Sequence, residues 1–451
     1  MPKPPNILFI ATDDHRADAL GAARHPVVRT PALDALAARG MRFSRAAHMG
    51  SLMPAVCSPA RAALLTGVNP LAADAAPGIR PDAGSGVARI RPDLKTLPQL
   101  FAAAGYETFL TGKWHNDTAA LLAGFTAGEA IFESGMCAHT AVPVRSRAEI
   151  AQGAPKRFAD GFSTEVFCGA TEKFIRGHGR AKPFFAWVAL TSPHDPRTPP
   201  PQWRRLYEPV AKLPLPPSFL PEPAFDNGEL AIRDELLAPK PLTPEVIREH
   251  LADYYGMISH QDEHLGRVLA ALQATGQEEN TVVVYAGDHG LALGSHGLLG
   301  KQNLYEPSLR VPLIVAGPGV TRGAVCDQFV YAFDLFATVL EQAGLAVPAG
   351  VDARSFAAQL RAPGMPARTD QFGFYRDCQR MTRRGDWKLI EYRPAGGRAR
   401  RELFNLATDP GELDDRSGDP AQAPILQRLR AQLRAQQAEF GDRWLHLEGA
   451  S

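Results

Sequence analysis

Four apolar runs along this 451-residue chain each end in a cluster of polar residues. The runs cover residues 6–12, 106–111, 184–191 and 281–286 and are rich in β-branched and aromatic side chains. Continuous apolar runs of this length, separated by helical patterns, are typical of parallel strands that helices cover on both faces. The chain is therefore expected to have an α/β fold, with a large, mostly parallel sheet sandwiched by helices.

Two of the covering helices can be placed from their ends. The first follows a Thr-Pro pair and covers residues 32–39, and the second begins at Pro244 and ends before Gly276. The proline-rich stretch 193–244 has no helical period. It is either an irregular excursion that shapes a substrate pocket or a surface linker.

The pattern changes near the C-terminus. Residues 381–392 and 401–406 are expected to form antiparallel strands, and the apolar spacing over 425–433 predicts a closing helix. We therefore expect a large α/β domain over residues 1–347 and a smaller subdomain over residues 348–451, built from an antiparallel sheet plus a helix.

Composition and charge exclude several classes of protein. The chain has 49 Lys+Arg against 48 Asp+Glu, which gives no basic footprint for nucleic acid. No apolar run reaches the ~20 residues of a membrane span, and the run at residues 7–11 is too short for a signal-peptide core. A cytoplasmic protein without nucleic-acid or membrane partners is expected.

The five cysteines are odd in number and widely spaced, which argues against a disulfide framework.

Two predicted strands are followed by pairs of metal-ligand side chains. Asp13 and Asp14 follow the first run, and Asp288 and His289 follow the fourth. Adjacent carboxylates repel each other, and a bound cation offsets that repulsion. Each pair alone is also common in loops. Because ligands bind at the carboxyl ends of parallel strands, the two pairs together predict a divalent metal site.

The segment from Cys57 to Arg61 combines a nucleophile with a cation. Pro59 fits the first turn of a helix that would end before Gly67, which places Cys57 at a helix N-terminus, where anions bind. Arg61 lies four residues on and shares a helix face with Cys57. The segment by itself fits a buried cysteine on an ordinary helix equally well.

Four further candidates lie at or beyond the ends of predicted strands. Lys113 and His115 follow the second run, His194 follows the third, and Lys301 lies downstream of the fourth. Taken singly, each is as readily a solvated or structural side chain, and only their shared position adds them to the candidate site. Five other polar residues are interpreted as structural: His15, Arg16, His48, His139 and His296.

In combination these motifs resemble those of the type I sulfatases, a family within the alkaline-phosphatase-like superfamily. The segment Cys57-Ser58-Pro59-Ala60-Arg61, with the following Leu65-Thr66-Gly67, is similar to the family's C-x-P-x-R motif and its L-T-G continuation. The other matches are Asn6 to Asp14, Gly112-Lys113-Trp114-His115, Gly287-Asp288-His289-Gly290 and Gly300-Lys301. The matches occur in family order from residue 6 to about residue 411, which makes the combination specific.

The resemblance implies a function and a role for each candidate. A formylglycine-generating enzyme would oxidise Cys57 to Cα-formylglycine, whose hydrate attacks the sulfur of a sulfate monoester on a carbohydrate or aryl alcohol. Four residues would bind the metal: Asp13, Asp14, Asp288 and His289. Arg61 would stabilise the hydrate, Lys113 would bind sulfate, and His115 would act in aldehyde regeneration. His194 and Lys301 would bind sulfate and assist the leaving group. Calcium is the expected metal, and the imidazole of His289 leaves manganese open.

Two other functions fit the same motifs. One is hydrolysis of a phosphonate monoester or phosphodiester by a member of the same superfamily. The other is a non-catalytic anion- or glycan-binding protein in which Cys57 stays a thiol. The segment 300–306 resembles that of bacterial carbohydrate sulfatases, which favours a sulfated sugar. The oligomeric state is left open.

Overall fold

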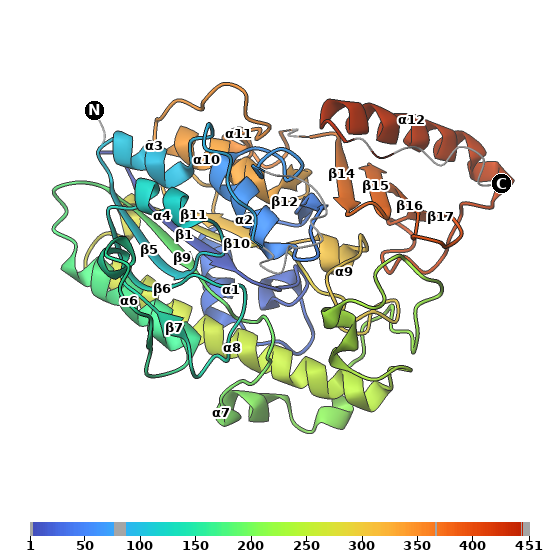
Figure 1. Ribbon diagram of the computed structural model, residues 1–451, viewed down its shortest axis with the longest axis horizontal. Coiled ribbons are helices and arrows are strands. Elements are labelled where there is room, and N and C mark those ends of the chain that lie inside the picture. Colours follow the sequence, from blue (N-terminus) through green and yellow to red (C-terminus); the bar gives the residue numbers. More distant parts are fainter. Residues whose placement is uncertain (1–2, 76–86, 366–367, 443, 445–451) are drawn as a thin grey trace.

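The computed structural model describes residues 3–75, 87–365, 368–442 and 444, and its centre is an eight-stranded sheet (Figure 1). Its strands are β1 (Asn6–Thr12), β2 (Gly40–Phe43), β5 (Glu107–Lys113), β6 (Ala127–Phe132), β9 (Phe184–Ala189), β10 (Thr281–Gly287), β11 (Leu313–Ala316) and β12 (Ala324–Cys326). They are ordered β12-β2-β11-β10-β1-β9-β5-β6, and only β11 runs antiparallel to its neighbours. The predicted α/β fold with a mostly parallel sheet is confirmed, and the four predicted strands are adjacent in it.

Helices cover both faces of this sheet, which explains the continuous apolar runs. On β1, Ile7 and Phe9 point into one core, and Leu8 and Ile10 point into the other. The first core is covered by α2 (Cys57–Thr66), α3 (Leu97–Ala103), α4 (Thr118–Gly124) and α10 (Leu335–Gln342). The second is covered by α1 (Pro31–Arg39), α6 (Ser163–Gly177) and α8 (Pro244–Ala274). The predicted bounds of α1 and α8 are therefore confirmed to within two residues.

A smaller sheet lies beside the large one, at the right of Figure 1. It consists of β14 (Asp370–Tyr375), β15 (Gln379–Arg384), β16 (Trp387–Tyr392) and β17 (Arg400–Asn405), and α12 (Ala423–Glu439) packs on it. The predicted antiparallel sheet and closing helix are confirmed. The segment 381–392 is a hairpin that turns at Gly385, and β14 was not predicted.

The smaller sheet also takes one strand from the N-terminal half of the chain. Strand β4 (Gly50–Ser51) pairs in parallel with β14, so that Gly50 lies opposite Phe374. Gly50 has a φ of 128°, and a Cβ there would lie 1.7 Å from the carbonyl oxygen of Phe374. Only glycine fits this approach. The division into parts at residue 348 stays a prediction, and β4 crosses it.

The remaining strands and α-helices are short. They are β3 (Ala46–Ala47), β7 (Pro143–Val144), β8 (Arg157–Phe158), β13 (Val330–Tyr331), α5 (Arg147–Ala151), α7 (Pro201–Arg204), α9 (Glu306–Leu309) and α11 (Ala357–Arg361). Within the described ranges, no helix has an apolar stretch long enough to cross a bilayer.

The N-terminus of α1 is capped by a side chain from α8. The carboxylate of Asp262 accepts the backbone N–H groups of Ala32 and Leu33, each at 2.8 Å. Asp262→Ala would leave one buried and one partly buried donor without an acceptor, so we expect the free energy of unfolding to fall by about 2–3 kcal/mol. Urea denaturation measures this loss. Glu263→Ala, which removes the neighbouring exposed carboxylate, is the control, and equal losses in the two variants would contradict the capping role.

Candidate active site

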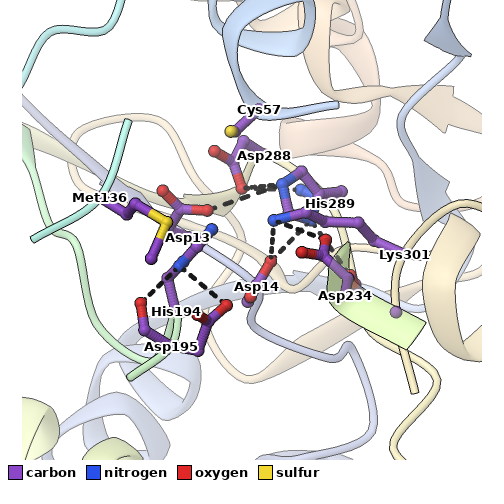
Figure 2. A network of polar contacts seen from close by, with 12 residues as sticks. Asp13, Asp14, Cys57, Met136, His194, Asp195, Asp234, Asp288, His289 and Lys301 are labelled. Carbon is purple, nitrogen blue, oxygen red and sulfur yellow. Dashed lines mark hydrogen bonds and ion pairs between the residues drawn. The ribbon is translucent and has the colours of Figure 1, made fainter. Parts of the chain in front are cut away.

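The polar residues that follow β1 and β10 meet at one edge of the sheet (Figure 2). The His289 ring lies between three carboxylates. Its Nε2 is 3.6 Å from Asp13 Oδ1 and 3.4 Å from Asp288 Oδ1, and its Nδ1 is 3.3 Å from Asp14 Oδ1. All four side chains are buried. The structure therefore brings together the four predicted metal ligands.

A local bend allows the two adjacent aspartates to converge. Asp14 has a φ of 60°, in the left-handed region, immediately after β1 ends. In a continuing strand, Asp13 and Asp14 would point to opposite faces of the sheet. Asparagine and aspartate tolerate the left-handed region better than most residues, because their short polar side chains can bond locally.

Several buried atoms of this cluster suit a cation. Asp13 Oδ1, Asp14 Oδ2 and His289 Nε2 are buried and have no hydrogen-bond partner in the described structure. Burial, and next the neighbouring Asp13 carboxylate, raise the pKa of Asp288 to about 7. Unpaired buried polar atoms and crowded carboxylates are both costly, and a divalent ion offsets both costs. The residues present thus fit a metal ion with oxygen and imidazole ligands.

Cys57 is the first residue of α2 and lies beside this cluster. Its Sγ is 3.6 Å from Lys113 Nζ and 3.5 Å from His115 Nδ1. Burial alone would raise the pKa of the thiol, but the Lys113 and Lys301 ammonium groups and a hydrogen bond from His289 together outweigh burial, and the pKa falls to about 7. The predicted helix is confirmed: it begins at Cys57 and ends before Gly67.

Arg61 connects α2 to the strand ends. Its Nε donates to Asp288 Oδ2 at 3.0 Å, and its Nη2 lies 3.4 Å from Asp13 Oδ2. Further bonds go to the backbone carbonyls of Lys113 and Leu190. A buried guanidinium with these partners holds two of the carboxylates in place.

Lys113 and His115 enter the site from the end of β5. Lys113 Nζ donates to Asp13 Oδ2 at 2.5 Å. In a continuing strand, Lys113 and His115 would share one face of the sheet. His115 has a φ of 52° just after β5 ends, so the chain bends. Burial, and next Lys113, hold the pKa of His115 well below its usual range, so this imidazole is neutral at pH 7.

Lys301 enters the cluster from the right of Figure 2 and His194 from the lower left, with Cys57 above both. Lys301 Nζ donates to Asp14 Oδ1 at 2.9 Å. His194 Nδ1 is 2.8 Å from the backbone oxygen of Asp195, whose carboxylate accepts from Arg233 Nη2 at 2.6 and 2.7 Å. All ten candidate residues thus lie in or around one buried cluster.

Sequence reasoning missed the polar residues that the proline-rich stretch contributes. Asp234 Oδ2 is 3.9 Å from Lys301 Nζ, and Arg197 Nη2 is 4.0 Å from Asp14 Oδ2. No motif marks either residue. The only signal in the sequence was the length and irregularity of the stretch 193–244. Of its two interpretations, an excursion that shapes a substrate pocket or a surface linker, the structure favours the first.

Comparison with known proteins identifies the family. The family model described as Sulfatase matches residues 5–345, which is about three quarters of the chain. The chain belongs to the sulfatase family. A second model, described as N-sulphoglucosamine sulphohydrolase, C-terminal, matches residues 294–439 of this sulfatase. The family expected from the motifs is confirmed, and with it the class of enzyme, a sulfuric ester hydrolase.

Three similar proteins show how widely this sulfatase shares its length and fold. An ulvan-active sulfatase from Formosa agariphila is 26% identical, with 98% of this chain and 82% of the relative covered. A structure solved in complex with its substrate D-glucosamine-2-N,6-O-disulfate has a TM-score of 0.79 at 22% identity, covering 98% of this chain and 99% of that one. A phosphonate monoester hydrolase from Silicibacter pomeroyi has a TM-score of 0.74 at 25% identity, covering 98% and 97%.

Proposed function

We propose that this enzyme hydrolyses a sulfate monoester of a carbohydrate or aryl alcohol, using a nucleophile made by oxidation of Cys57. The observation that carries the proposal is the position of Cys57 at the start of α2, with Lys113 Nζ and His115 Nδ1 beside its Sγ. A helix N-terminus and an ammonium group both favour the anionic group that is transferred. The named substrates of similar proteins, ulvan and a sulfated glucosamine, support a glycan sulfate.

Two groups would complete the site. Cα-formylglycine, made at Cys57 by a maturation enzyme, supplies an attacking hydroxyl in its hydrated form and a second hydroxyl for sulfate release. A divalent ion, proposed as calcium with manganese as the alternative, supplies Lewis-acid stabilisation of negative charge. Its ligands would be Asp13, Asp14, Asp288 and His289. Asp13 Oδ1, Asp14 Oδ2 and His289 Nε2 have no hydrogen-bond partner in the described structure, and Asp288 Oδ1 lies 3.4 Å from His289 Nε2.

The other side chains have roles that follow from their positions. Lys113 faces residue 57 and is placed to bind sulfate oxygens. His115, neutral at pH 7, is placed to take a proton from the hydroxyl of residue 57. His194 and Lys301 enter the same cluster (Figure 2), where they would bind sulfate and protonate the departing alcohol. Arg61 orients the site through Asp13 and Asp288.

Hydrolysis of a phosphonate monoester or phosphodiester is the second candidate. It is favoured by the similarity to a phosphonate monoester hydrolase and by the imidazole among the proposed ligands. A sulfate monoester and a phosphodiester each carry one negative charge, so the charges of the site do not separate them. Comparative kinetics does, and a kcat/KM for a phosphonate monoester equal to or above that for a sulfate ester would overturn the first candidate.

The proposed nucleophile has a direct test. In protein co-produced with a formylglycine-generating enzyme, the peptide that contains Cys57 is expected to be about 18 Da lighter than its thiol form, because oxidation replaces the thiol with an aldehyde oxygen. Mass spectrometry of the digested protein measures this. The peptide containing Cys168, a free buried cysteine in α6, is the internal control. An unchanged Cys57 peptide, under conditions that convert another sulfatase, would favour the non-catalytic binding protein.

A further inference from the structure

A second cluster of metal-ligand side chains lies between α6 and α8, which run side by side (Figure 1). His260 and His264 lie one turn apart on α8, with their ring centroids 4.7 Å apart. Glu165, in the first turn of α6, places its Oε1 at 3.2 Å from His260 Nε2 and 4.0 Å from His264 Nε2. One ligand atom from each residue lies within 4.8 Å of the other two. None of the three belongs to the candidate active site.

The local structure fixes these side chains and leaves ligand atoms available. Glu165 Oε2 accepts the backbone N–H of Phe162, which orients the carboxylate and leaves Oε1 facing the histidines. His260 Nδ1 is buried, and no described residue offers it a hydrogen bond. The His264 ring likewise makes no hydrogen bond with a described residue, and its Nε2 lies 4.0 Å from Glu165 Oε1. The one side-chain hydrogen bond that a metal would replace, among the described residues, is that between His260 Nε2 and Glu165 Oε1, which joins two of the ligand atoms themselves.

Charge and exposure also suit a cation. Burial, and next the neighbouring His264, lower the pKa of His260 to about 4, and burial lowers that of His264, so both rings are neutral at pH 7. Neutral imidazole is the form that binds metals. The side chain of Glu165 is 43% exposed, which gives an ion access from solvent.

We propose that Glu165, His260 and His264 form a second metal site that takes Zn²⁺ or a similar transition-metal ion. Two imidazoles and one carboxylate, with a fourth position open to water, are a known ligand set for zinc. Calcium prefers oxygen ligands, so two nitrogens in three select against it.

Binding here would stabilise the fold next to the active site. The metal would clamp the first turn of α6 to the middle of α8. In the same turn of α6, Ser163 Oγ lies 2.7 Å from His139 Nδ1, and His139 Nε2 lies 2.9 Å from the backbone oxygen of His194. A metal bound to Glu165 would therefore fix Ser163, from which hydrogen bonds run through His139 to the backbone of His194.

The test titrates Zn²⁺ into the full-length holoenzyme kept in excess Ca²⁺, followed by calorimetry and thermal unfolding. His264→Gln is expected to weaken zinc binding at least ~10-fold and to remove the rise in Tm that zinc causes. Glu165→Gln should weaken binding too, while its side-chain oxygen keeps the bond to Phe162. The matched control is His250→Gln, a half-buried histidine on the same helix, which should bind zinc as the wild type does.

A zinc-soaked crystal gives an independent measurement. Anomalous density between Glu165, His260 and His264 in the wild type, and its loss in His264→Gln, are the expected results. Wild-type zinc affinity in both His264→Gln and Glu165→Gln, or anomalous density only at Asp13 and its neighbours, would overturn the proposal. Because the readouts are zinc binding and Tm, they are independent of whether Cys57 is matured.

Discussion

Cys57→Ser is expected to convert the enzyme into a protein that reacts with its substrate at most once. The serine hydroxyl would lie at the start of α2, close to Lys113 and His115, where it can still accept a sulfuryl group. A serine sulfate has no second hydroxyl on the same carbon, so it has no route for expelling sulfate. We therefore expect steady-state turnover to fall by at least ~10⁴-fold, with a burst of no more than one equivalent of alcohol.

An aryl sulfate reporter and intact-protein mass spectrometry measure both parts of this prediction. The reporter gives the burst and the turnover, and a mass gain of about 80 Da on the serine peptide marks the trapped sulfate. Cys168→Ala, at a buried cysteine of α6, is the control and should turn over substrate many times. Repeated turnover by Cys57→Ser, within tenfold of the wild type, would contradict the proposed nucleophile.

Asp13→Asn is expected to cause the second-largest loss, because Asp13 faces both the proposed metal and two cations. Its Oδ1 has no hydrogen-bond partner among the described residues, and its Oδ2 accepts from Lys113 Nζ and Arg61 Nη2. The carboxamide keeps the shape but removes the charge. It therefore weakens a metal ligand and leaves Lys113 buried without its anionic partner. We expect metal affinity to fall at least ~100-fold and kcat/KM at least ~10³-fold.

Metal content and calcium titration check this second prediction. Asp234→Asn is the matched control, since Asp234 is also a buried carboxylate near a lysine of the site but is not among the proposed ligands. It should keep the wild-type metal content. If Asp13→Asn binds calcium as tightly as the wild type, the proposed ligand set is wrong.

The parts of the fold that could be predicted are those with a local physical signal. Strands β1, β5, β9 and β10 are buried on both faces, so each is a continuous apolar run that the sequence shows directly. Strand β4 has only two residues, and its partner β14 lies far along the chain. Such a pairing leaves no periodic pattern in either segment.

The residues of the candidate site could likewise be predicted only where a local signal marks them. Asp13, Lys113, His194 and Asp288 could be grouped because parallel strands end at a common edge, whatever the loops do. Asp234 could not, because an irregular stretch of chain brings it to Lys301 and its position depends on tertiary packing alone.

The pairing of β4 with β14 has a consequence for the order of events on the ribosome. Gly50 cannot meet Phe374 until the roughly 320 residues between them have been made, which takes about 15–65 s at common rates of translation. During that interval the segment that leads into Cys57 has no partner strand, and Asp288 and Lys301 are also missing at first. In the finished protein Cys57 is only 3% exposed. If Cys57 is oxidised as proposed, vectorial synthesis would give the maturation enzyme a period of access to the nascent chain that ends when the C-terminal sheet forms.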